Sequence, residues 1–146
     1  MRIISGNFKG SKLYIPKNKN TRPLKDLARE SIFNLLTHSN KISFQLKQTN
    51  VLDLYAGTGS FGLECLSREA KKVCFIENEK SAFIILKKNI EKLKLEKKTE
   101  VFLSDVYNLI KKKLNSKFDL IFCDPPFKDS NIKKLIESIY NSNLLN

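Results

Sequence analysis

The residues with the clearest chemical meaning close the stretch Phe118–Phe127, which ends in Asp-Pro-Pro-Phe. An apolar run that stops at this motif predicts a strand followed by a rigid turn, because each proline fixes φ and removes a backbone donor. The Asp124 carboxylate and the nearby carbonyls are then presented as hydrogen-bond acceptors. Such a loop suits a planar amino group, such as an exocyclic nitrogen of a nucleic-acid base. The candidate catalytic residues are Asp124, Pro125, Pro126 and Phe127.

A second motif, Val51–Gly62, predicts a strand that runs into a glycine turn and then a helix. Its glycines fit G-x-G-x-x-G, the pattern of a dinucleotide site with pyrophosphate at the helix amino terminus. Asp53 argues against that ligand, because a carboxylate at the strand end would repel a pyrophosphate. It could instead accept a hydrogen bond from the ammonium of a cationic ligand, directly or through water. A zwitterionic sulfonium compound therefore fits the turn better.

Acidic residues also end the next two predicted strands. Glu77 lies about 20 residues beyond the turn, where a carboxylate can bind both hydroxyls of an adenosine ribose. Asp105 could accept a hydrogen bond from an adenine amino group while Val106 packs on the ring. An Asp before a helix is also an ordinary N-cap, and both interpretations of Asp105 stay open. The candidate cofactor-binding residues are Asp53, Tyr55, Ala56, Gly57, Thr58, Gly59, Glu77, Asn78, Asp105 and Val106.

Periodicity along the chain predicts the elements that hold these residues in place. Residues 2–16 carry two β-prone runs separated by glycines, which predicts a hairpin. A helix follows Arg22-Pro23 and ends near His38. We expect its buried face to be apolar and to consist of Leu27, Ala28, Ile32, Leu35 and Leu36.

From Asn50 onward, strand and helix alternate, which predicts an α/β fold with a parallel sheet. We expect the strand order 3-2-1-4, with the fourth strand leaving an unpaired edge. Residues 1–146 then form a single domain, with a basic hairpin and helix (1–40) and an α/β core (50–146). The expected strands are 51–54, 72–77, 100–103 and 118–123, and the apolar helix faces are Phe83, Leu86, Ile90 and Leu93, then Ile132, Leu135, Ile136 and Ile139.

The formal net charge of +12 is large for 146 residues and points to a polyanionic partner, with nucleic acid as the first choice. All charged residues before Asp26 are basic, whereas the lysines of 87–98 alternate with glutamates as on a solvated helix face. The candidate nucleic-acid-binding residues are Arg2, Lys9, Lys12 and Arg22.

Composition argues against several classes of protein. The 41% apolar content is typical of a globular domain, and no apolar run approaches the roughly 20 residues of a membrane span. A secretory signal is absent from the amino terminus, so we expect a cytoplasmic protein. Cys65, Cys74 and Cys123 form no C-x-x-C pair and are expected to be buried thiols, with no metal site.

The chain resembles the RsmD family of 16S ribosomal RNA (guanine-N2) methyltransferases over essentially its whole length. The Asp53–Gly59 and Asp124–Phe127 motifs occur in many methyltransferases, whereas the amino-terminal blocks are specific to this family. Those blocks are Arg2–Gly6 with Lys9-Gly10 and Leu13, then Thr21–Pro23 with Asp26, Arg29-Glu30 and Phe33-Asn34.

This resemblance implies a class I S-adenosylmethionine-dependent methyltransferase with a Rossmann-like sheet. The activity it implies is methyl transfer to the exocyclic N2 of one guanosine in 16S ribosomal RNA. The partner would be ribosomal RNA or the assembling small ribosomal subunit. By the same resemblance Asp53, Gly57 and Gly59 bind the cofactor, Glu77 its ribose and Asp105 its adenine, and Asp124–Phe127 bind the target base.

The chain departs from the family pattern in two places. Leu24 and Leu27 stand where the family has Thr and Arg, so one basic RNA contact is expected to be missing. The chain also stops after the helix that follows Asp-Pro-Pro-Phe, whereas relatives continue with further strands, so C-terminal strands are expected to be missing.

Three alternative functions compete with this interpretation. An adenine-N6 methyltransferase uses the same acceptor logic, although its turn usually opens with Asn. A catalytically inactive RNA-binding relative would keep the basic arm but need not bind the cofactor. An NAD-dependent oxidoreductase is opposed by Asp53 and by the lack of a hydride-transfer site.

Overall fold

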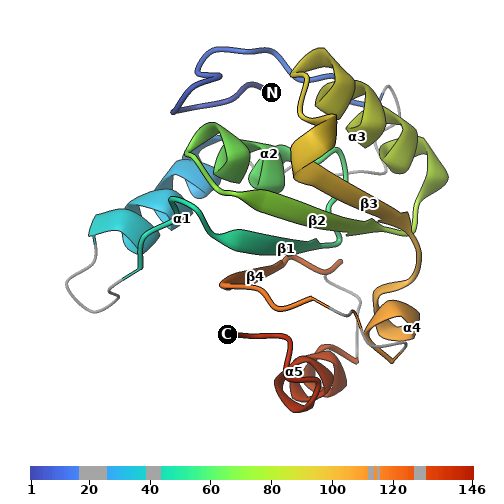
Figure 1. Ribbon diagram of the computed structural model, residues 1–146. Helices are drawn as coiled ribbons and strands as arrows, with labels where there is room; N and C mark the ends of the chain where they lie inside the picture. The colour runs from blue at the N-terminus through green and yellow to red at the C-terminus, as the bar shows by residue number, and fades with distance from the viewer. Residues whose placement is uncertain (17–25, 39–43, 112–113, 115, 127–130) are drawn as a thin grey trace.

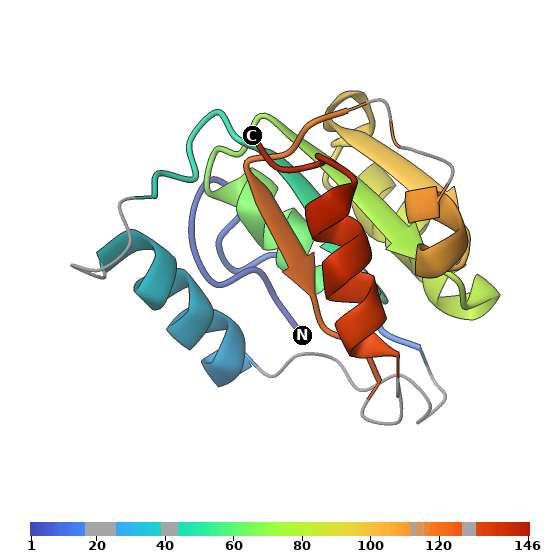
Figure 2. The same cartoon turned by 90° about the horizontal axis from the view of Figure 1, so that it is seen from below.

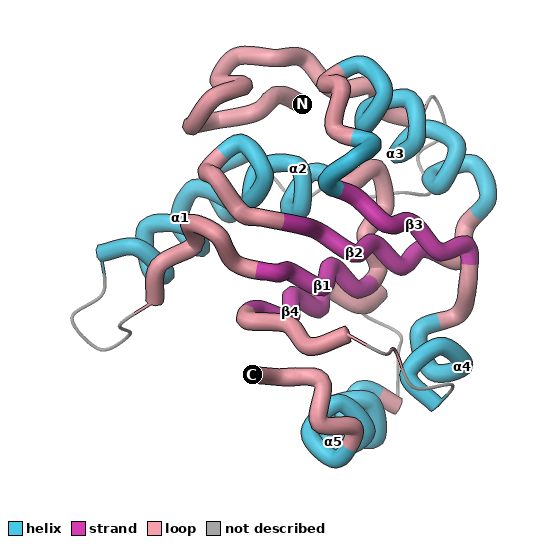
Figure 3. Tube along the Cα trace, viewed as in Figure 1, coloured by secondary structure: helices cyan, strands magenta, loops and turns pink. Residues whose placement is uncertain are grey.

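A computed structural model describes residues 1–16, 26–38, 44–111, 114, 116–126 and 131–146. Its four strands form one parallel sheet in the order β3-β2-β1-β4, which confirms the predicted order (Figure 3). The strands are β1 (Asn50–Leu54), β2 (Lys72–Glu77), β3 (Thr99–Leu103) and β4 (Leu120–Cys123).

The fourth strand is shorter than the expected 118–123. Phe118 forms an isolated parallel bridge with Leu145 and so pairs on the side of β4 away from β1. The backbone of Phe118 donates to the Leu144 carbonyl at 2.7 Å and accepts from the Asn146 N–H at 2.9 Å. Within the described residues, Leu120–Cys123 pairs with β1 alone, as the expected open edge requires.

Helices cover both faces of this sheet. In Figure 1, α2 and α3 lie on one face together with the amino-terminal residues, and α4 and α5 lie on the other. Figure 2 shows α5 running beside β4. The helices are α1 (Asp26–His38), α2 (Ser60–Ser67), α3 (Lys80–Lys92), the 3-10 helix η1 (Glu96–Lys98), α4 (Val106–Lys111) and α5 (Ile132–Asn141). Within the described residues no helix is both long and apolar enough to cross a membrane.

Alternate residues of each central strand enter two separate cores. Val51 packs in the core beneath α2 and α3, whereas Leu52 and Leu54 pack in the core against α4 and α5. This alternation follows from the two-residue period of a strand. It places Asp53 on the α2 face. Cys65 and Cys74 are buried in these cores as expected, but Cys123 is only partly buried because it lies on edge strand β4.

Residues 1–16, called the arm below, fold back on themselves as the predicted hairpin does. Arg2 and Lys12 form an antiparallel bridge, and the Ile3 N–H donates to the Ser11 carbonyl at 3.0 Å. The turn between them is tight, with Gly6 at φ 80° and Gly10 at φ 85°. The arm contains no regular strand, because this bridge is followed by loop rather than by a ladder.

Two polar side chains of α2 fasten the arm to the domain. Glu64, which is 0% exposed, accepts from the Ile4 N–H at 2.7 Å and from the Ser5 N–H at 2.9 Å. Ser67 accepts from the Phe8 N–H at 3.0 Å. The arm is therefore held by buried backbone-to-side-chain hydrogen bonds.

The buried face of α1 matches the predicted one only in part: Ile32 and Leu36 pack against the core, but Leu27, Ala28 and Leu35 are exposed. Leu27 is 76% exposed and Leu35 57% exposed, whereas Arg29 and Phe33 are fully buried. Phe33 stacks on Phe61 of α2 with ring centroids 5.0 Å apart. Apolar periodicity does not predict this face, because a buried arginine lies at its centre.

The buried Arg29 guanidinium makes polar contacts with the arm and with α1 itself. Its Nη2 donates to the Arg2 carbonyl and to the Asp26 carboxylate, and its Nε lies 4.0 Å from Glu64. Burial lowers the pKa of Arg29, with Glu64 and Asp26 opposing that effect. Thus α1, α2 and the arm meet at one buried arginine.

Candidate active site

The sheet register brings the predicted strand-end acids to one edge. Leu54 pairs with Ile76 of β2 and with Cys123 of β4. The residues that follow these partners are Glu77 and Asp124, so both acids lie level with the end of β1. On the far side of β2, Leu103 pairs with Glu77, and the Ser104 N–H donates to the Glu77 carbonyl at 2.9 Å. The crevice at the carboxyl ends of parallel strands is the usual ligand site of such sheets.

The turn after β1 has the sharply bent backbone that the glycine motif predicts. Tyr55, Gly57 and Gly59 have φ values of 57°, 56° and 83°. The Ala56 N–H donates to the Ile76 carbonyl at 2.9 Å, and the Gly59 N–H donates to the Ala56 carbonyl at 2.8 Å. Tyr55 holds a conformation that side chains rarely adopt, which marks the turn as locally strained.

The three glycines of the motif serve different purposes. A Cβ on Gly62 would lie 2.3 Å from the Phe75 ring, and one on Gly59 would lie 2.3 Å from Leu86. Both therefore allow close packing of helix and sheet. A Cβ on Gly57 would meet nothing within 4 Å. Gly57 thus borders open space at the strand ends, where a ligand can approach the backbone.

Asp53 is 1% exposed and supports the turn from below. Its Oδ2 accepts from the Gly62 N–H at 3.0 Å, a contact within the protein that the sequence did not reveal. Burial raises the pKa of Asp53 to about 7, with the Gly62 hydrogen bond opposing this shift and the negative charges of Glu77 and Asp124 adding to it. A cation bound nearby would lower that pKa again.

Glu77 is held in a fixed orientation and is 6% exposed. Its Oε2 accepts from the Gly57 N–H at 2.6 Å, and its Oε1 accepts from the Glu79 N–H at 2.7 Å. Each carboxylate oxygen has further acceptor capacity, so these bonds leave room for ligand hydroxyls. Asn78 is exposed directly after it.

Asp105 acts as a helix N-cap. Its Oδ1 accepts from the Tyr107 N–H at 2.9 Å and from the Asn108 N–H at 3.2 Å. Capping involves one oxygen and is compatible with an adenine contact through the other. Val106 is 3% exposed and packs in the core with Leu52 and Leu54.

Asp124 is exposed at the end of β4, followed by half-buried Pro125 and exposed Pro126. Phe127 lies outside the described residues. Sequence reasoning missed the support for this loop, which comes from Phe122. Its ring stacks on Phe61 with centroids 3.7 Å apart and joins β4 to α2, the helix that starts from the glycine turn. An aromatic at the alternate position of the strand, two residues before Asp124, is the signal that could have found it.

The site carries uncompensated negative charge. Within the described residues, no lysine or arginine forms an ion pair with Asp53, Glu77 or Asp124. Nor do the described residues contain a group of three or more His, Cys, Asp or Glu side chains arranged to hold a metal ion. A cationic organic ligand fits this acidic edge, and an anionic pyrophosphate does not.

The predicted RNA-binding residues lie on the arm. Arg2, Lys9 and Lys12 are all exposed, and the bridge between Arg2 and Lys12 places these two side by side. Arg22 lies outside the described residues.

Solved structures with a similar fold define the class. The protein yhhF of Escherichia coli, described as a methyltransferase, superimposes with a TM-score of 0.85 and 30% sequence identity over 100% of this chain and 75% of that one. Together with the four-stranded parallel sheet, this likeness defines an α/β methyltransferase of the Rossmann-like class I, a class whose cofactor is S-adenosylmethionine. The acidic edge and the open face of Gly57 fit that cationic cofactor.

Sequence comparisons identify the family. The model of the family described as conserved hypothetical protein 95 matches residues 1–146. Ribosomal RNA small subunit methyltransferase D of Buchnera aphidicola is 37% identical over 95% of this chain and 69% of its own length. The protein of the same name from Haemophilus influenzae is 36% identical over 99% of this chain and 73% of its own length. The chain therefore belongs to the family of ribosomal RNA small subunit methyltransferase D, whose members here are longer than this chain.

Proposed function

We propose that this chain transfers a methyl group from S-adenosylmethionine to the exocyclic N2 of a guanosine in 16S ribosomal RNA. The observation that carries the proposal is the acidic edge itself. Three carboxylates, those of Asp53, Glu77 and Asp124, surround a glycine turn that faces open space. The family relationship supports ribosomal RNA as the substrate class.

The cofactor would lie against the glycine turn, where it supplies a methyl group on a cationic sulfur. The buried carboxylate of Asp53 would stabilise the positive charge of the ligand electrostatically, and its hydrogen bond to the Gly62 N–H would hold the turn in place. Glu77 is oriented by two backbone hydrogen bonds and would accept from the ribose hydroxyls. The N-capped Asp105 would accept from the adenine amino group with its second oxygen.

The target base would bind at the Asp-Pro-Pro loop. The lone pair of an aromatic amine is delocalised into the ring, so hydrogen-bond acceptors are needed to draw its N–H groups toward tetrahedral geometry. Asp124 and the Pro125 carbonyl would be these acceptors, and Phe127 would stack on the extruded base. Positioning then contributes most of the rate, and no strong base is required.

The basic arm would bind the phosphates of the RNA. Arg2, Lys9 and Lys12 are exposed on a structure that is fastened directly to α2, the helix that begins at the glycine turn. We propose that Arg22, which lies outside the described residues, also binds phosphate. The arm would therefore orient RNA relative to the site as well as attract it.

The test is to incubate the purified chain with labelled S-adenosylmethionine and 16S ribosomal RNA, naked or in small subunits, and to identify the methylated nucleoside by mass spectrometry. We expect N2-methylguanosine. A matched RNA in which inosine replaces guanosine lacks the N2 amino group and should accept no label.

The other outcomes separate the alternatives. N6-methyladenosine would identify an adenine-N6 methyltransferase and contradict the proposed specificity. Cofactor binding without methyl transfer to 16S ribosomal RNA, whether naked or in small subunits, would contradict the proposed activity. RNA binding without cofactor binding would identify an RNA-binding relative that has lost catalysis.

A further inference from the structure

Asn89 of α3 is a fully buried polar residue that contacts both the arm and the glycine turn. It is 0% exposed. Its Oδ1 accepts from the Tyr14 N–H at 2.7 Å. Its Nδ2 donates to the Tyr14 carbonyl at 3.2 Å and to the Thr58 carbonyl at 3.0 Å. One side chain thus joins two segments that carry different proposed roles.

These contacts satisfy the buried amide entirely with partners on two distant segments. A side chain buried on a helix can often be satisfied by its neighbours, whereas Asn89 reaches residues 75 and 31 positions away. Both of its amide hydrogens are used across that gap. Burial makes each bond costly to lose, so movement of the turn should be felt at Tyr14.

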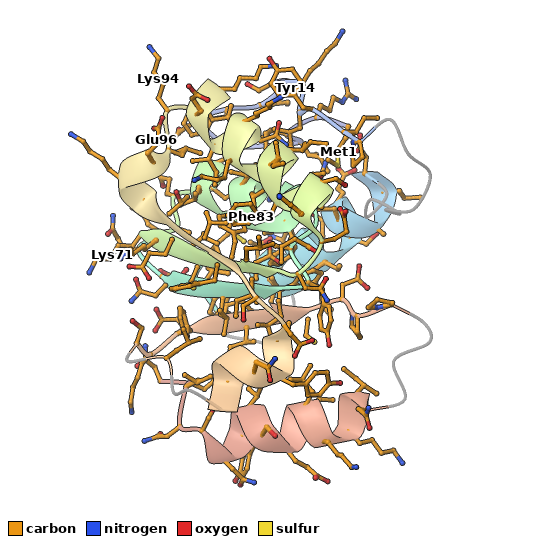
Figure 4. The ribbon with its side chains drawn as sticks, turned by 90° about the vertical axis from the view of Figure 1, so that its right-hand side faces the viewer. Met1, Tyr14, Lys71, Phe83, Lys94 and Glu96 are labelled. Carbon is orange, nitrogen blue, oxygen red and sulfur yellow. The ribbon has the colours of Figure 1, made fainter. Side chains whose placement is uncertain are left out.

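Thr58 lies between Gly57 and Gly59, so its carbonyl belongs to the backbone that borders the open space at the strand ends. Tyr14 lies near the end of the described arm and over α3, as Figure 4 shows. Lys92 also holds this part of the arm, because its Nζ donates to the Lys12 carbonyl at 2.6 Å and lies 4.7 Å from the Tyr14 ring centroid. Within the described residues Lys92 forms no hydrogen bond or ion pair with the turn, which makes it a matched control for Asn89.

We propose that Asn89 is a positioning residue that couples the cofactor turn to the RNA-binding arm, so that cofactor and RNA each strengthen the binding of the other. The inference rests on the proposed function of the arm. When the cofactor orders the turn, Asn89 would order Tyr14 as well. The arm would then lose less conformational entropy when it binds RNA, so RNA would bind more tightly. Linkage requires the same factor in both directions.

The coupling is measured by titrating 16S RNA into the chain with and without saturating S-adenosylhomocysteine, the demethylated product, which prevents turnover. We expect the RNA dissociation constant to fall by a factor of about 5 or more when the ligand is present, which is at the lower end of typical coupling factors. Asn89→Leu removes all three bonds at similar volume, and Asn89→Asp keeps the acceptor for the Tyr14 N–H but loses both donations. Both variants should bring the ratio close to one.

Lys92→Met is the control, since it weakens the hold on the arm and removes a charge without touching the turn. Its RNA affinity should fall, but its coupling ratio should stay at the wild-type value. A wild-type ratio of one, or an unchanged ratio in both Asn89 variants, would overturn the proposal.

Amide hydrogen exchange gives an independent measurement that needs no RNA. S-adenosylhomocysteine should slow exchange of the Tyr14 and Ile15 amides in the wild type and in Lys92→Met, but not in Asn89→Leu. Exchange that responds equally in all three would contradict the coupling while leaving the proposed activity intact. Failure of the wild type to bind S-adenosylhomocysteine would instead count against the proposed function. An Asn89→Ser variant, which is smaller and polar, replaces Asn89→Leu if the latter does not fold.

Discussion

At the scale of single residues, the chemistry of the site depends most on Asp53. Its carboxyl group is buried, bonded to the Gly62 N–H, and close to two other acids, which together raise its pKa to about 7. A buried acid with no cationic partner among the described residues is unfavourable for the fold alone. This cost is understandable if the acid helps to bind a cation.

Cofactor affinity should therefore depend on pH. Only ionised Asp53 favours the cationic cofactor, so affinity should rise about tenfold between about pH 5.5 and pH 7 as the group of pKa about 7 ionises. Calorimetric titration with S-adenosylmethionine across this range would measure the change. Asp53→Asn keeps an oxygen for the Gly62 N–H and should remove the pH dependence. A persistent tenfold rise in that variant would assign it to another group.

The same pKa predicts the direction of a stability change. Because the folded chain holds this proton more tightly than the unfolded one, the contribution of Asp53 to the free energy of unfolding should be largest below the usual carboxyl pKa of about 4 and fall as pH rises toward about 7. Denaturant unfolding at several pH values would measure the fall. In Asp53→Asn the slope of stability against pH should be shallower, and an identical slope would contradict the assignment.

Gly57 and Gly62 should respond differently to alanine. Gly62→Ala places a methyl 2.3 Å from the Phe75 ring and should destabilise the fold by about 1 to 3 kcal/mol through overpacking. Gly57→Ala meets no atom and should cost about 1 to 2 kcal/mol for its positive φ, yet lose cofactor binding because the methyl fills the open face. Thermal melts and calorimetry would distinguish them. Full cofactor affinity in Gly57→Ala would show that the ligand does not approach that face.

Asp124 should affect catalysis but not cofactor affinity. Its carboxylate is exposed and is proposed to contact the base, so Asp124→Ala should lower kcat about 100-fold or more while the cofactor dissociation constant changes little. Single-turnover methylation with labelled cofactor, beside calorimetry, would measure both. Asp124→Asn retains one acceptor oxygen, so its kcat should lie between those of the wild type and Asp124→Ala. Full turnover by Asp124→Ala would exclude the proposed role.

At the scale of elements, α2 connects the glycine turn, β4, the arm and α1. It starts at the glycine turn, and its Phe61 supports β4 through Phe122. Further along, its Glu64 holds the arm, meets Arg29 of α1 and forms an ion pair with Arg68 at 2.9 Å. Two of the Arg29 nitrogens, Nε and Nη1, have no hydrogen-bond partner within the described residues, so this network depends on the charge of Glu64.

Removing Glu64 should therefore be severely destabilising. Glu64→Ala leaves two arm N–H groups without their acceptor and removes a buried negative charge that faces the Arg29 guanidinium, so it should cost about 3 to 5 kcal/mol. Denaturant unfolding followed by circular dichroism would measure this loss. Glu96→Gln on the exposed η1 is the matched control and should change stability by less than about 0.5 kcal/mol. A loss below about 1 kcal/mol in Glu64→Ala would mean that the arm is not held through this residue.

At the scale of the whole molecule, charge is divided between two regions. The arm presents exposed basic residues, whereas acids lie at the carboxyl ends of the central strands. This division suits a protein that binds a polyanion on one surface and a small cation in another.

Neutralising the arm should weaken RNA binding and reduce its salt dependence. Replacing Arg2, Lys9 and Lys12 together with alanine should make the negative slope of log affinity against log salt shallower by about 2 to 3. Each phosphate contact contributes slightly less than one released counterion to that slope, and three contacts are lost. Fluorescence anisotropy at several salt concentrations would measure it. The control changes Lys71, Lys97 and Lys98, exposed residues outside the arm, to alanine and loses equal charge. Equal slopes in the two triple variants would mean that only net charge matters.

The sequence by itself determined the alternation of strands and helices, the position of the glycine turn and the placing of Glu77, Asp105 and Asp124 at strand ends. These features follow from local patterns, because the two-residue period of strands and the demands of a tight turn are written in neighbouring residues. The resemblance on the amino-terminal blocks and the Asp-Pro-Pro-Phe motif likewise depended on short segments.

Tertiary structure alone decided which face of α1 is buried, how the arm is held and how acidic Asp53 is. The contacts that hold the arm join distant residues, such as Ile4 with Glu64, 60 positions apart, and Tyr14 with Asn89, 75 positions apart, and they leave no periodic signal in the chain. Arg29 was missed for the same reason, since a polar residue can be buried only where distant partners satisfy it. Burial and neighbouring charges set a pKa, and both are properties of the assembled fold.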